Sequence, residues 1–331
     1  MENVTYFLRN HKVGFSIQKV FDPILRYNKI KSSQIVSMPS QRASPKAVLT
    51  NMIFAYRHRN RNGVNHITGD CHYLVLALPR CKTVLTIHDI GHYKHVRNPI
   101  KRALLFWLWH RLPVKYADAV TCISEATKED LLRHIPIDPR KITVIGDCYD
   151  PSFTYTPKTF NKECPDILHV GTSPNKNLHR VIEALEGIYC HLTIVGPLDS
   201  ETSLSLKKKK IDYTHLENLT DEEILNCYKQ CDIVSFPSLF EGFGMPVIEG
   251  KAVGRPVLTS DLEPMKTIAG SSCCLVDPLS SESIRKGFKR LIEDDAYRDR
   301  CIRLSLENVK QYSVEKISDY YNKVYSSVIK K

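Results

Sequence analysis

The feature that most constrains this chain is an alternation of short apolar segments with helical patterns, which occurs twice. In the first half, β-branched and aromatic residues predict strands at Val4–Leu8, Val64–Thr68, Leu74–Leu78, Thr83–His88, Ala119–Ile123 and Ile142–Ile145. Helical patterns lie at Ser16–Tyr27, Pro99–Lys115 and Glu125–His134, the last preceded by Ser124 as a predicted helix cap. Strands that alternate with helices predict a parallel sheet covered by helices on both faces.

The alternation restarts after Asp150–Asp166, a polar stretch with three prolines and no periodic pattern, which is typical of a linker. Beyond it we predict strands at Ile167–Val170, Leu192–Val195, Ile233–Phe236, Pro256–Thr259 and Cys274–Val276. The predicted helices are Leu178–Glu186, Asp221–Gln230, Pro246–Ala252 and Glu282–Ile292. We therefore expect an α/β protein with two Rossmann-like domains that face a central cleft.

The charge of the chain is concentrated in one of these halves. Residues 1–150 hold 23 Lys and Arg against 11 Asp and Glu, whereas residues 151–331 hold 24 against 25. In the first 117 residues the imbalance reaches 19 against 4. A cationic half indicates an anionic partner, such as nucleic acid, an acidic membrane or a phosphorylated substrate, or else a solubilising surface bias. No helix–turn–helix pattern, zinc-ligand spacing or aromatic stacking motif favours nucleic acid.

The cysteines and the apolar segments indicate a reducing compartment. The 11 Cys are scattered without a C-x-x-C pair, and the N-terminus lacks an apolar signal segment. The longest apolar run, Ala103–Trp109, is far shorter than the roughly 20 residues that span a bilayer. We expect a cytoplasmic protein with free, mostly buried thiols, either soluble or peripherally bound to the inner face of the membrane.

One string after a predicted strand carries candidate chemistry. Two glycines flank Phe243 directly before a helix that Pro246 can start. The backbone N–H groups of Gly244 and Met245 would then lie unpaired at the helix start, which attracts anions. Glu241 precedes this turn and Glu249 lies about one helical turn inside. Taken alone, the string also fits a tight strand–helix turn with two surface glutamates.

The complete string resembles the E-x7-E motif of retaining glycosyltransferases of family 4 (glycosyl transferases group 1), which have the GT-B fold. Glu241 and Glu249 match its two acidic positions, and the resemblance implies donor contacts for the residues between them, Gly242, Phe243, Gly244 and Met245. It implies that Glu241 holds hydroxyls of the transferred sugar and acts in catalysis, and that Glu249 binds the ribose.

A second stretch, Leu168–Leu178, resembles the strand, loop and helix that open the second domain of this family. Gly171 matches a glycine that lets the donor approach, and Lys176 matches a lysine that contacts the nucleotide diphosphate. The family usually has a second basic residue in this loop, where this chain has Thr172 and Asn175. This departure leaves open a non-catalytic, sugar-nucleotide-binding partner subunit.

The resemblance also implies a division of labour between the domains. Residues 1–152 would bind the acceptor and residues 153–312 the nucleotide sugar, while a helix in residues 313–331 would cross back to the first domain. His88 and Asp89 follow a predicted strand and match a His-Asp pair of the family that faces the reacting sugar, which implies a catalytic part for both. His88 would hydrogen-bond the donor sugar or help to bind the acceptor, and Asp89 would orient His88 or bind the acceptor hydroxyl. Gly14 is a candidate to approach the donor phosphates.

The implied reaction moves a hexose from a nucleotide diphosphate sugar to an acceptor hydroxyl with retention of configuration. No D-x-D metal motif occurs, so we expect no metal and no cofactor. The anticipated acceptor is a lipid-linked or other cell-surface glycan precursor, as in polysaccharide biosynthesis. A GT-B epimerase or phosphorylase and a basic nucleic-acid-binding protein remain alternatives, and the sugar, the base and the linkage stay open.

Both tryptophans of the chain lie in one basic segment. Lys101, Arg102, Trp107, Trp109 and Arg111 combine cations with large aromatic rings, and the segment 101–115 holds no acidic residue. This combination is typical of a helix that lies in a membrane interface. The alternative is a core helix whose tryptophans pack inside. With the cationic first half, we expect contact with an anionic membrane surface.

Overall fold

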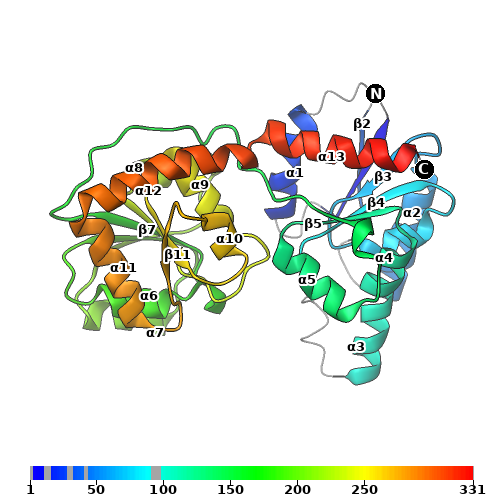
Figure 1. The fold of residues 1–331 in the computed structure, drawn as a ribbon. Coiled ribbons are helices and arrows are strands. Elements are labelled where there is room, and N and C mark those ends of the chain that lie inside the picture. The colour runs from blue at the N-terminus through cyan, green and yellow to red at the C-terminus, as the bar shows by residue number, and fades with distance from the viewer. Residues whose placement is uncertain (1–2, 11–15, 28–32, 41–43, 91–97, 331) are drawn as a thin grey trace. The chain divides into compact units, whose positions relative to one another are not determined.

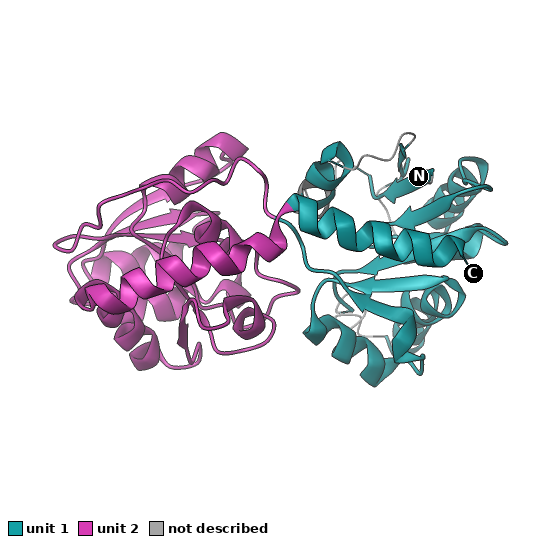
Figure 2. Ribbon diagram, turned by 45° about the horizontal axis from the view of Figure 1, so that its top comes forward, with its two compact units in different colours: residues 1–148, 314–331 teal, residues 149–313 magenta. Residues whose placement is uncertain are grey.

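The structure, a computed structural model, describes residues 3–10, 16–27, 33–40, 44–90 and 98–330. The chain forms two compact units, which Figure 2 distinguishes by colour. Unit 1 comprises residues 1–148 together with 314–331, and unit 2 comprises residues 149–313. The chain therefore leaves unit 1 once and returns to it with its last helix.

Unit 1 is built on a six-stranded sheet in which every strand pair is parallel. The strand order is β2-β1-β3-β4-β5-β6. Its strands are β1 (Val4–Leu8), β2 (Ser33–Ser37), β3 (Val64–Ile67), β4 (Lys82–Ile87), β5 (Ala119–Cys122) and β6 (Ile142–Val144). Its α-helices, seen in Figure 1, are α1 (Ser16–Tyr27), α2 (Pro45–Arg57), α3 (Pro99–Phe106), α4 (Leu112–Tyr116), α5 (Glu125–His134) and α13 (Val314–Ile329). Ser124 caps α5, as predicted, by accepting a hydrogen bond from the Thr127 N–H.

Unit 2 repeats the plan with strand order β12-β11-β10-β7-β8-β9, again with parallel pairs throughout. Its strands are β7 (Asp166–Val170), β8 (His191–Val195), β9 (Asp212–Leu216), β10 (Ile233–Phe236), β11 (Val257–Ser260) and β12 (Cys274–Val276). Its α-helices are α6 (Leu178–Leu185), α7 (Ser200–Lys208), α8 (Asp221–Gln230), α9 (Met245–Val253), α10 (Met265–Ala269), α11 (Ser281–Glu293) and α12 (Asp295–Asn308). The predicted fold class, two Rossmann-like α/β domains, is confirmed.

Each sheet has one place where the strand order reverses direction. In unit 1 it lies between β1 and β3, and in unit 2 between β7 and β10. Open parallel sheets bind ligands beyond the carboxyl ends of the strands at such a switch point. The loops that follow these four strands are therefore the expected location of a ligand-binding site.

One predicted strand is wrong, because Leu74–Leu78 lies in a 3₁₀ helix, His72–Ala77. The segment is apolar and buried nearly throughout, so periodicity could not separate strand from buried helix. Topology decides the question: β3 and β4 are adjacent and parallel, so the chain between them must cross one face of the sheet. The predicted helix Pro99–Lys115 is α3 and α4 joined by a π-helical turn, Trp107–Arg111.

Helix α13 is held in unit 1 by a buried polar network. It lies against α1, β3 and β4. The Tyr325 hydroxyl is 2.8 Å from Nδ1 of His66 and donates to the Tyr6 hydroxyl at 3.3 Å, while His66 Nε2 is 2.7 Å from Oγ1 of Thr86. Burial lowers the pKa of His66 to about 3, with a smaller contribution from His88, so its ring is neutral. The last helix thus completes the sheet face of unit 1.

Candidate functional site

The switch point of unit 2 brings together the two loops that the sequence singled out. Lys176 follows β7 and Glu241 follows β10, and Nζ of the lysine donates to Oε1 of the carboxylate at 2.7 Å. Their side chains are 21% and 14% exposed, so the ion pair is largely shielded from water. The ammonium also lies 4.7 Å from the centroid of the Phe236 ring. This loop pair therefore presents a fixed charge pair at the carboxyl edge of the sheet.

Two asparagines fasten these loops to each other. Asn175 donates from Nδ2 to the Phe240 carbonyl at 3.0 Å and to Glu241 Oε1 at 3.2 Å. Its own carbonyl accepts from the Leu239 N–H at 2.8 Å. Asn175 occupies one of the places where the family usually has a second basic residue, and here it supports the Glu241 carboxylate by hydrogen bonding.

Asn177 was missed by the sequence analysis and is fully buried beneath the loops. It takes the left-handed conformation, with φ of 65°, at the start of α6. Its Nδ2 donates to the carbonyls of Pro237 at 2.9 Å and Pro278 at 2.7 Å, which joins the loops after β7, β10 and β12. The signal was the residue type, because asparagine tolerates this conformation better than most side chains.

Gly171 is required by the position of Lys176. Its φ of +92° strains any other residue, and an added Cβ would stand 3.0 Å from both Cγ and Cε of Lys176. The lysine side chain therefore passes directly over this glycine. The predicted part of Gly171 in donor approach stays a prediction.

The start of α9 has the geometry that its sequence predicts. Gly244 stands before the first helical residue with φ of 139°, and Pro246 lies in the first turn. Within the described residues, no side chain caps this helix start. Phe243 is buried with its ring edge-on to Tyr312, while Gly242 and Met245 remain partly exposed. An uncapped helix start carries partial positive charge, which favours an anion.

Glu249 lies one turn inside α9, where Tyr228 of α8 meets it. The Tyr228 hydroxyl donates to Oε2 of Glu249 at 2.6 Å. Tyr228 was not predicted as a site residue, because it belongs to a helix pattern whose apolar positions read as core. The structure thus groups Lys176 with Glu241, and Tyr228 with Glu249, on the loops and helices around β10.

His88 lies at the carboxyl end of β4 in unit 1. Its Nε2 is 2.8 Å from the Thr68 carbonyl, which only accepts, so Nε2 carries the hydrogen. The ring stands edge-on to Phe21, with centroids 6.3 Å apart. Asp89 is partly exposed beside it, and Gly14 lies outside the described residues.

Asp147 is a third residue that the sequence did not predict. It follows β6, is 6% exposed, and is electrostatically coupled to His88. Burial raises the pKa of this carboxyl to about 6, an effect that His88 partly offsets. A buried carboxyl with a raised pKa beside a histidine marks a candidate functional residue. The only sequence signal was an acidic residue soon after a strand.

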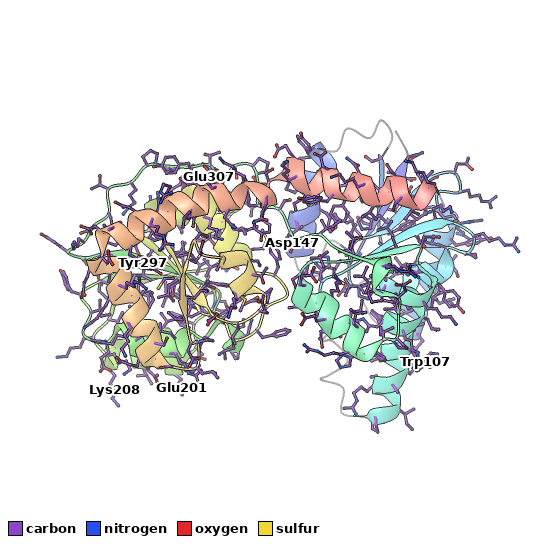
Figure 3. The ribbon with its side chains drawn as sticks, in the orientation of Figure 1. Trp107, Asp147, Glu201, Lys208, Tyr297 and Glu307 are labelled. Atoms are coloured by element: carbon purple, nitrogen blue, oxygen red, sulfur yellow. The ribbon has the colours of Figure 1, made fainter. Side chains whose placement is uncertain are left out.

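The structure separates the two tryptophans of the basic segment. Figure 3 shows Trp107 at the part of unit 1 that carries α3; this side chain is 47% exposed, beside Ile100 at 80% and Leu104 at 66%. Lys101 and Arg102 are exposed, and the Arg111 guanidinium lies 4.7 Å from the centroid of the Trp107 ring.

Trp109 points inward and does not fit the predicted membrane contact. Its Nε1 donates to the Asp70 carbonyl at 2.8 Å, and its ring packs edge-on against Tyr73 at a centroid distance of 4.7 Å. Trp107 and Trp109 are two positions apart in a helical segment, so their side chains point to opposite sides of it. Trp109 is only partly exposed, so the exposed surface of this segment is formed mainly by other residues.

The described residues hold neither a membrane-spanning helix nor a cluster of metal-binding side chains. None of the helices in residues 3–330 that the structure describes is both long and apolar enough to cross a membrane. Among the same residues, no three His, Cys, Asp or Glu side chains gather closely enough to hold a metal ion. None of the eleven cysteines, all of which lie within the described residues, forms a disulfide, and eight of them are buried.

Two family models match almost consecutive parts of the chain. The model for "Glycosyltransferase Family 4" matches residues 30–153, and the model for "Glycosyl transferases group 1" matches residues 156–305. The boundary between the two matches falls close to the boundary between the two units, and the second match contains the loops around Lys176 and Glu241.

Named relatives and solved structures extend these matches. The chain is 26% identical to O-antigen chain mannosyltransferase RfbU of Salmonella typhimurium, over 71% of this chain and 69% of that one. It is 28% identical to O-antigen chain mannosyltransferase B of Escherichia coli, over 75% of this chain and 70% of that one. The crystal structure of Anabaena HepE in complex with UDP and glucose has a similar fold, with a TM-score of 0.79 at 15% identity, covering 99% of this chain and 100% of that one.

Proposed function

Because the chain belongs to the glycosyltransferases of group 1 and family 4 and has the GT-B fold, we propose that it transfers a hexose from a nucleotide diphosphate sugar to an acceptor hydroxyl, with retention of configuration. Glycosyl transfer itself is supported by the family models and by the mannosyltransferase relatives. The observation that carries the finer proposal is the Lys176–Glu241 pair at the switch point of unit 2, beside the uncapped start of α9.

The leaving group of such a reaction is a nucleoside diphosphate, whose negative charge grows as the glycosidic bond breaks. Lys176 and the backbone N–H groups of Gly244 and Met245 supply positive charge that is already in place before the reaction. Preorganised charge of this kind lowers the barrier without reorganisation at the moment of bond breaking. We therefore propose that stabilisation comes from these groups, without a metal or other cofactor.

The remaining site residues follow the same scheme. Glu241, held by Lys176 and Asn175, would accept hydrogen bonds from hydroxyls of the transferred sugar. Glu249 would accept from the ribose. His88 and Asp89 would contact the donor sugar or the acceptor hydroxyl, and Gly14 and Gly171 would allow the phosphates to approach. The leaving phosphate would assist deprotonation of the acceptor on the same face of the sugar.

The acceptor proposal rests on relatives. RfbU and mannosyltransferase B carry O-antigen chain names, which supports a lipid-linked or other cell-surface glycan precursor as acceptor. HepE was crystallised with UDP and glucose, which supports a nucleotide sugar as donor.

A panel of nucleotide sugars and nucleoside diphosphates tests the donor. We expect one of them to raise the melting temperature of the purified chain, and Glu241→Gln to abolish transfer while the melting temperature without ligand is retained. If no nucleotide in the panel binds the wild-type chain, the proposed function is wrong. A chain that binds but forms no glycoside with any acceptor favours the partner-subunit alternative.

We also propose that the exposed segment around α3 binds the inner, anionic face of a membrane. Ile100, Leu104 and Trp107 would enter the interface, while Lys101, Arg102 and Arg111 meet acidic headgroups. No residue of α3 is buried, and residues 99–104 are exposed, although Phe106 at the end of the helix packs against the core of unit 1. This exposure supports the proposed contact.

Sedimentation with vesicles of anionic and of neutral lipid measures this contact. Trp107→Ala with Lys101→Glu should lower binding to anionic vesicles several-fold, and added salt should lower wild-type binding, since each basic residue near the surface contributes about 1 kcal/mol. Tyr189→Ala with Lys286→Glu, on exposed residues of unit 2, is the matched control. Equal binding by both double variants would contradict the proposal.

A further inference from the structure

We propose that Tyr228 is a positioning residue: it fixes the carboxylate of Glu249 for the ribose hydroxyls of the donor. This rests on the proposed function, which gives Glu249 its ligand. The contact is a 2.6 Å hydrogen bond from the Tyr228 hydroxyl to Oε2 of Glu249, formed between α8 and α9. A hydroxyl that donates to a carboxylate makes a short, charge-assisted bond, so it restricts the rotation of the carboxylate strongly.

The tyrosine can only act as a donor here. Carboxylate oxygens accept and do not donate, so the proton of this bond belongs to the phenol. Burial, and then the neighbouring Glu249 charge, raise the pKa of Tyr228 well above its ordinary value. The phenol therefore stays protonated throughout the working pH range, and the bond does not titrate away.

Tyr228 is itself held rigidly. It is fully buried, and the ring of Phe153 stands edge-on to it at a centroid distance of 5.4 Å. Its helix, α8, begins with a complete capping box in which Thr220 and Glu223 satisfy each other's backbone N–H groups. These contacts hold the Tyr228 side chain in one orientation, and its hydroxyl in turn holds the carboxylate of Glu249 through their hydrogen bond.

The helix that carries Glu249 is fixed at its other end as well. Gly250 brings α9 so close to the sheet that an added Cβ would lie 3.0 Å from side-chain atoms of both Val234 and Val257. The Val253 carbonyl accepts from the Thr156 N–H at 3.2 Å, which fastens the segment entering unit 2 to the end of α9. The backbone of α9 is thus held against the sheet at Gly250 and fastened at Val253, and Tyr228 acts on the side chain of Glu249.

The consequence is specific to the ribose. Two neighbouring hydroxyls bind one carboxylate well only when its plane is already oriented, since ordering it during binding costs affinity. Removing the phenol oxygen should therefore weaken the binding of a ribonucleotide, and should spare a ligand that lacks these hydroxyls. A residue that merely packed the core would affect both ligands alike.

Calorimetry on the full chain tests this with Tyr228→Phe, which keeps the ring and its packing. The probes are the nucleoside diphosphate that raises the melting temperature most and its 2′,3′-dideoxy analogue. We expect the variant to bind the ribonucleotide roughly 5- to 30-fold more weakly, which is less than the full contribution of a hydrogen bond to a charged group because Tyr228 acts through Glu249 and does not touch the ligand. Binding of the dideoxy analogue should stay within twofold of wild type, and donor KM should rise while kcat changes little.

Further variants test the same role and serve as controls. Glu249→Gln should show the same ribose-specific loss, and the double variant should lose little more than Glu249→Gln alone, because both act through one carboxylate. Tyr189→Phe, on a 79% exposed tyrosine, should match wild type. If Tyr228→Phe does not fold, Tyr228→Leu, which also lacks the donor and is smaller than tyrosine, is measured by the same ratio.

The outcomes separate the two proposals. A wild-type chain that binds no nucleotide overturns the proposed function, and this inference with it. A wild-type chain that prefers the ribonucleotide, with Tyr228→Phe equally selective, overturns the positioning role alone. Equal losses for both ligands also overturn it, because they show a packing effect.

Discussion

The carboxyl edges of the two sheets share one architecture and differ in how they hold charge. In unit 2, Lys176 and Glu241 form a 2.7 Å pair that is largely shielded from water. In unit 1, the pair at the switch point is Arg9 with Asp70 at 3.4 Å, with side chains 19% and 33% exposed. Farther along the same edge, Asp147 is buried, and its pKa is raised by that burial.

The two edges therefore differ in whether their buried charges are compensated by neighbouring groups. Unit 2 compensates its charges internally, so Lys176 and Glu241 are held in position by each other and by Asn175. Unit 1 keeps a buried carboxyl whose ionised form is unfavourable, which is common where function constrains a site. Removing a charge is therefore expected to weaken nucleotide binding at the edge of unit 2, and to raise the free energy of unfolding at the edge of unit 1.

Lys176→Ala should have the largest effect. It removes the cation from the proposed diphosphate site and leaves Glu241, at 14% exposure, with only Asn175 as a hydrogen-bond donor among the described residues. Hydrogen bonds to charged groups contribute about 1.5–3 kcal/mol, so nucleoside diphosphate binding should weaken roughly 10- to 150-fold. Calorimetry of nucleotide binding measures the loss.

The control for this prediction is Lys310→Ala. Lys310 pairs with Glu307 at 2.8 Å on the surface of the same unit, where both side chains are at least 67% exposed. Exposed pairs contribute little, so this variant should bind nucleotide like wild type. If both variants bound equally well, the internal compensation of unit 2 would have no part in donor binding.

The fold followed from the sequence wherever strands were buried on both faces. Segments such as Ile233–Phe236 and Val4–Leu8 are apolar runs of the right length, and the structure has them as predicted. The strands that escaped prediction are β2 and β9, which form sheet edges and have polar sequences, Ser33–Ser37 and Asp212–Leu216. An edge strand needs no continuous apolar run, so its sequence carries a weak signal.

The site was predictable as far as local motifs reach. The loops with Lys176 and Glu241 stood out because glycine and proline fix their backbones before a helix. Asn177, Tyr228 and Asp147 did not, because their importance comes from residues distant in the sequence. Asn177 reaches Pro278 across 101 positions, for example, and only the folded sheet brings them together.

Asp147→Asn should change stability by a smaller amount and in the favourable direction. The native pKa of about 6 lies above the usual Asp value, so the native state binds more protons than the unfolded state between about pH 4 and pH 6. Relative to pH 7, the protonation of Asp147 therefore raises the free energy of unfolding. This gain is fully present below about pH 4 and is lost as the pH rises through 6. Asparagine cannot ionise, so the variant should be about 1–3 kcal/mol more stable at pH 7.

Urea unfolding at pH 4 and pH 7 measures this difference. We expect the stabilisation to be present at pH 7 and nearly absent at pH 4. A variant that is less stable than wild type at pH 7 would show that the charge of Asp147 is compensated, and the contrast between the two edges would disappear.

Gly171→Ala should have the smallest effect on nucleotide binding, and it tests whether the path of Lys176 over this glycine matters. Gly171 and Gly187 both have positive φ, +92° and +74°, so alanine at either position costs about 1–2 kcal/mol in backbone strain. The added Cβ meets Lys176 carbons at 3.0 Å in the first case, whereas in the second its nearest neighbour is an Arg285 nitrogen at 3.9 Å. Both variants should lose similar stability, but only Gly171→Ala should displace the lysine and weaken nucleotide binding, by a few-fold. Equal nucleotide affinity in the two variants would mean that Lys176 needs no exact path over Gly171, and that the rigidity of this edge comes from Asn175 and Asn177 instead.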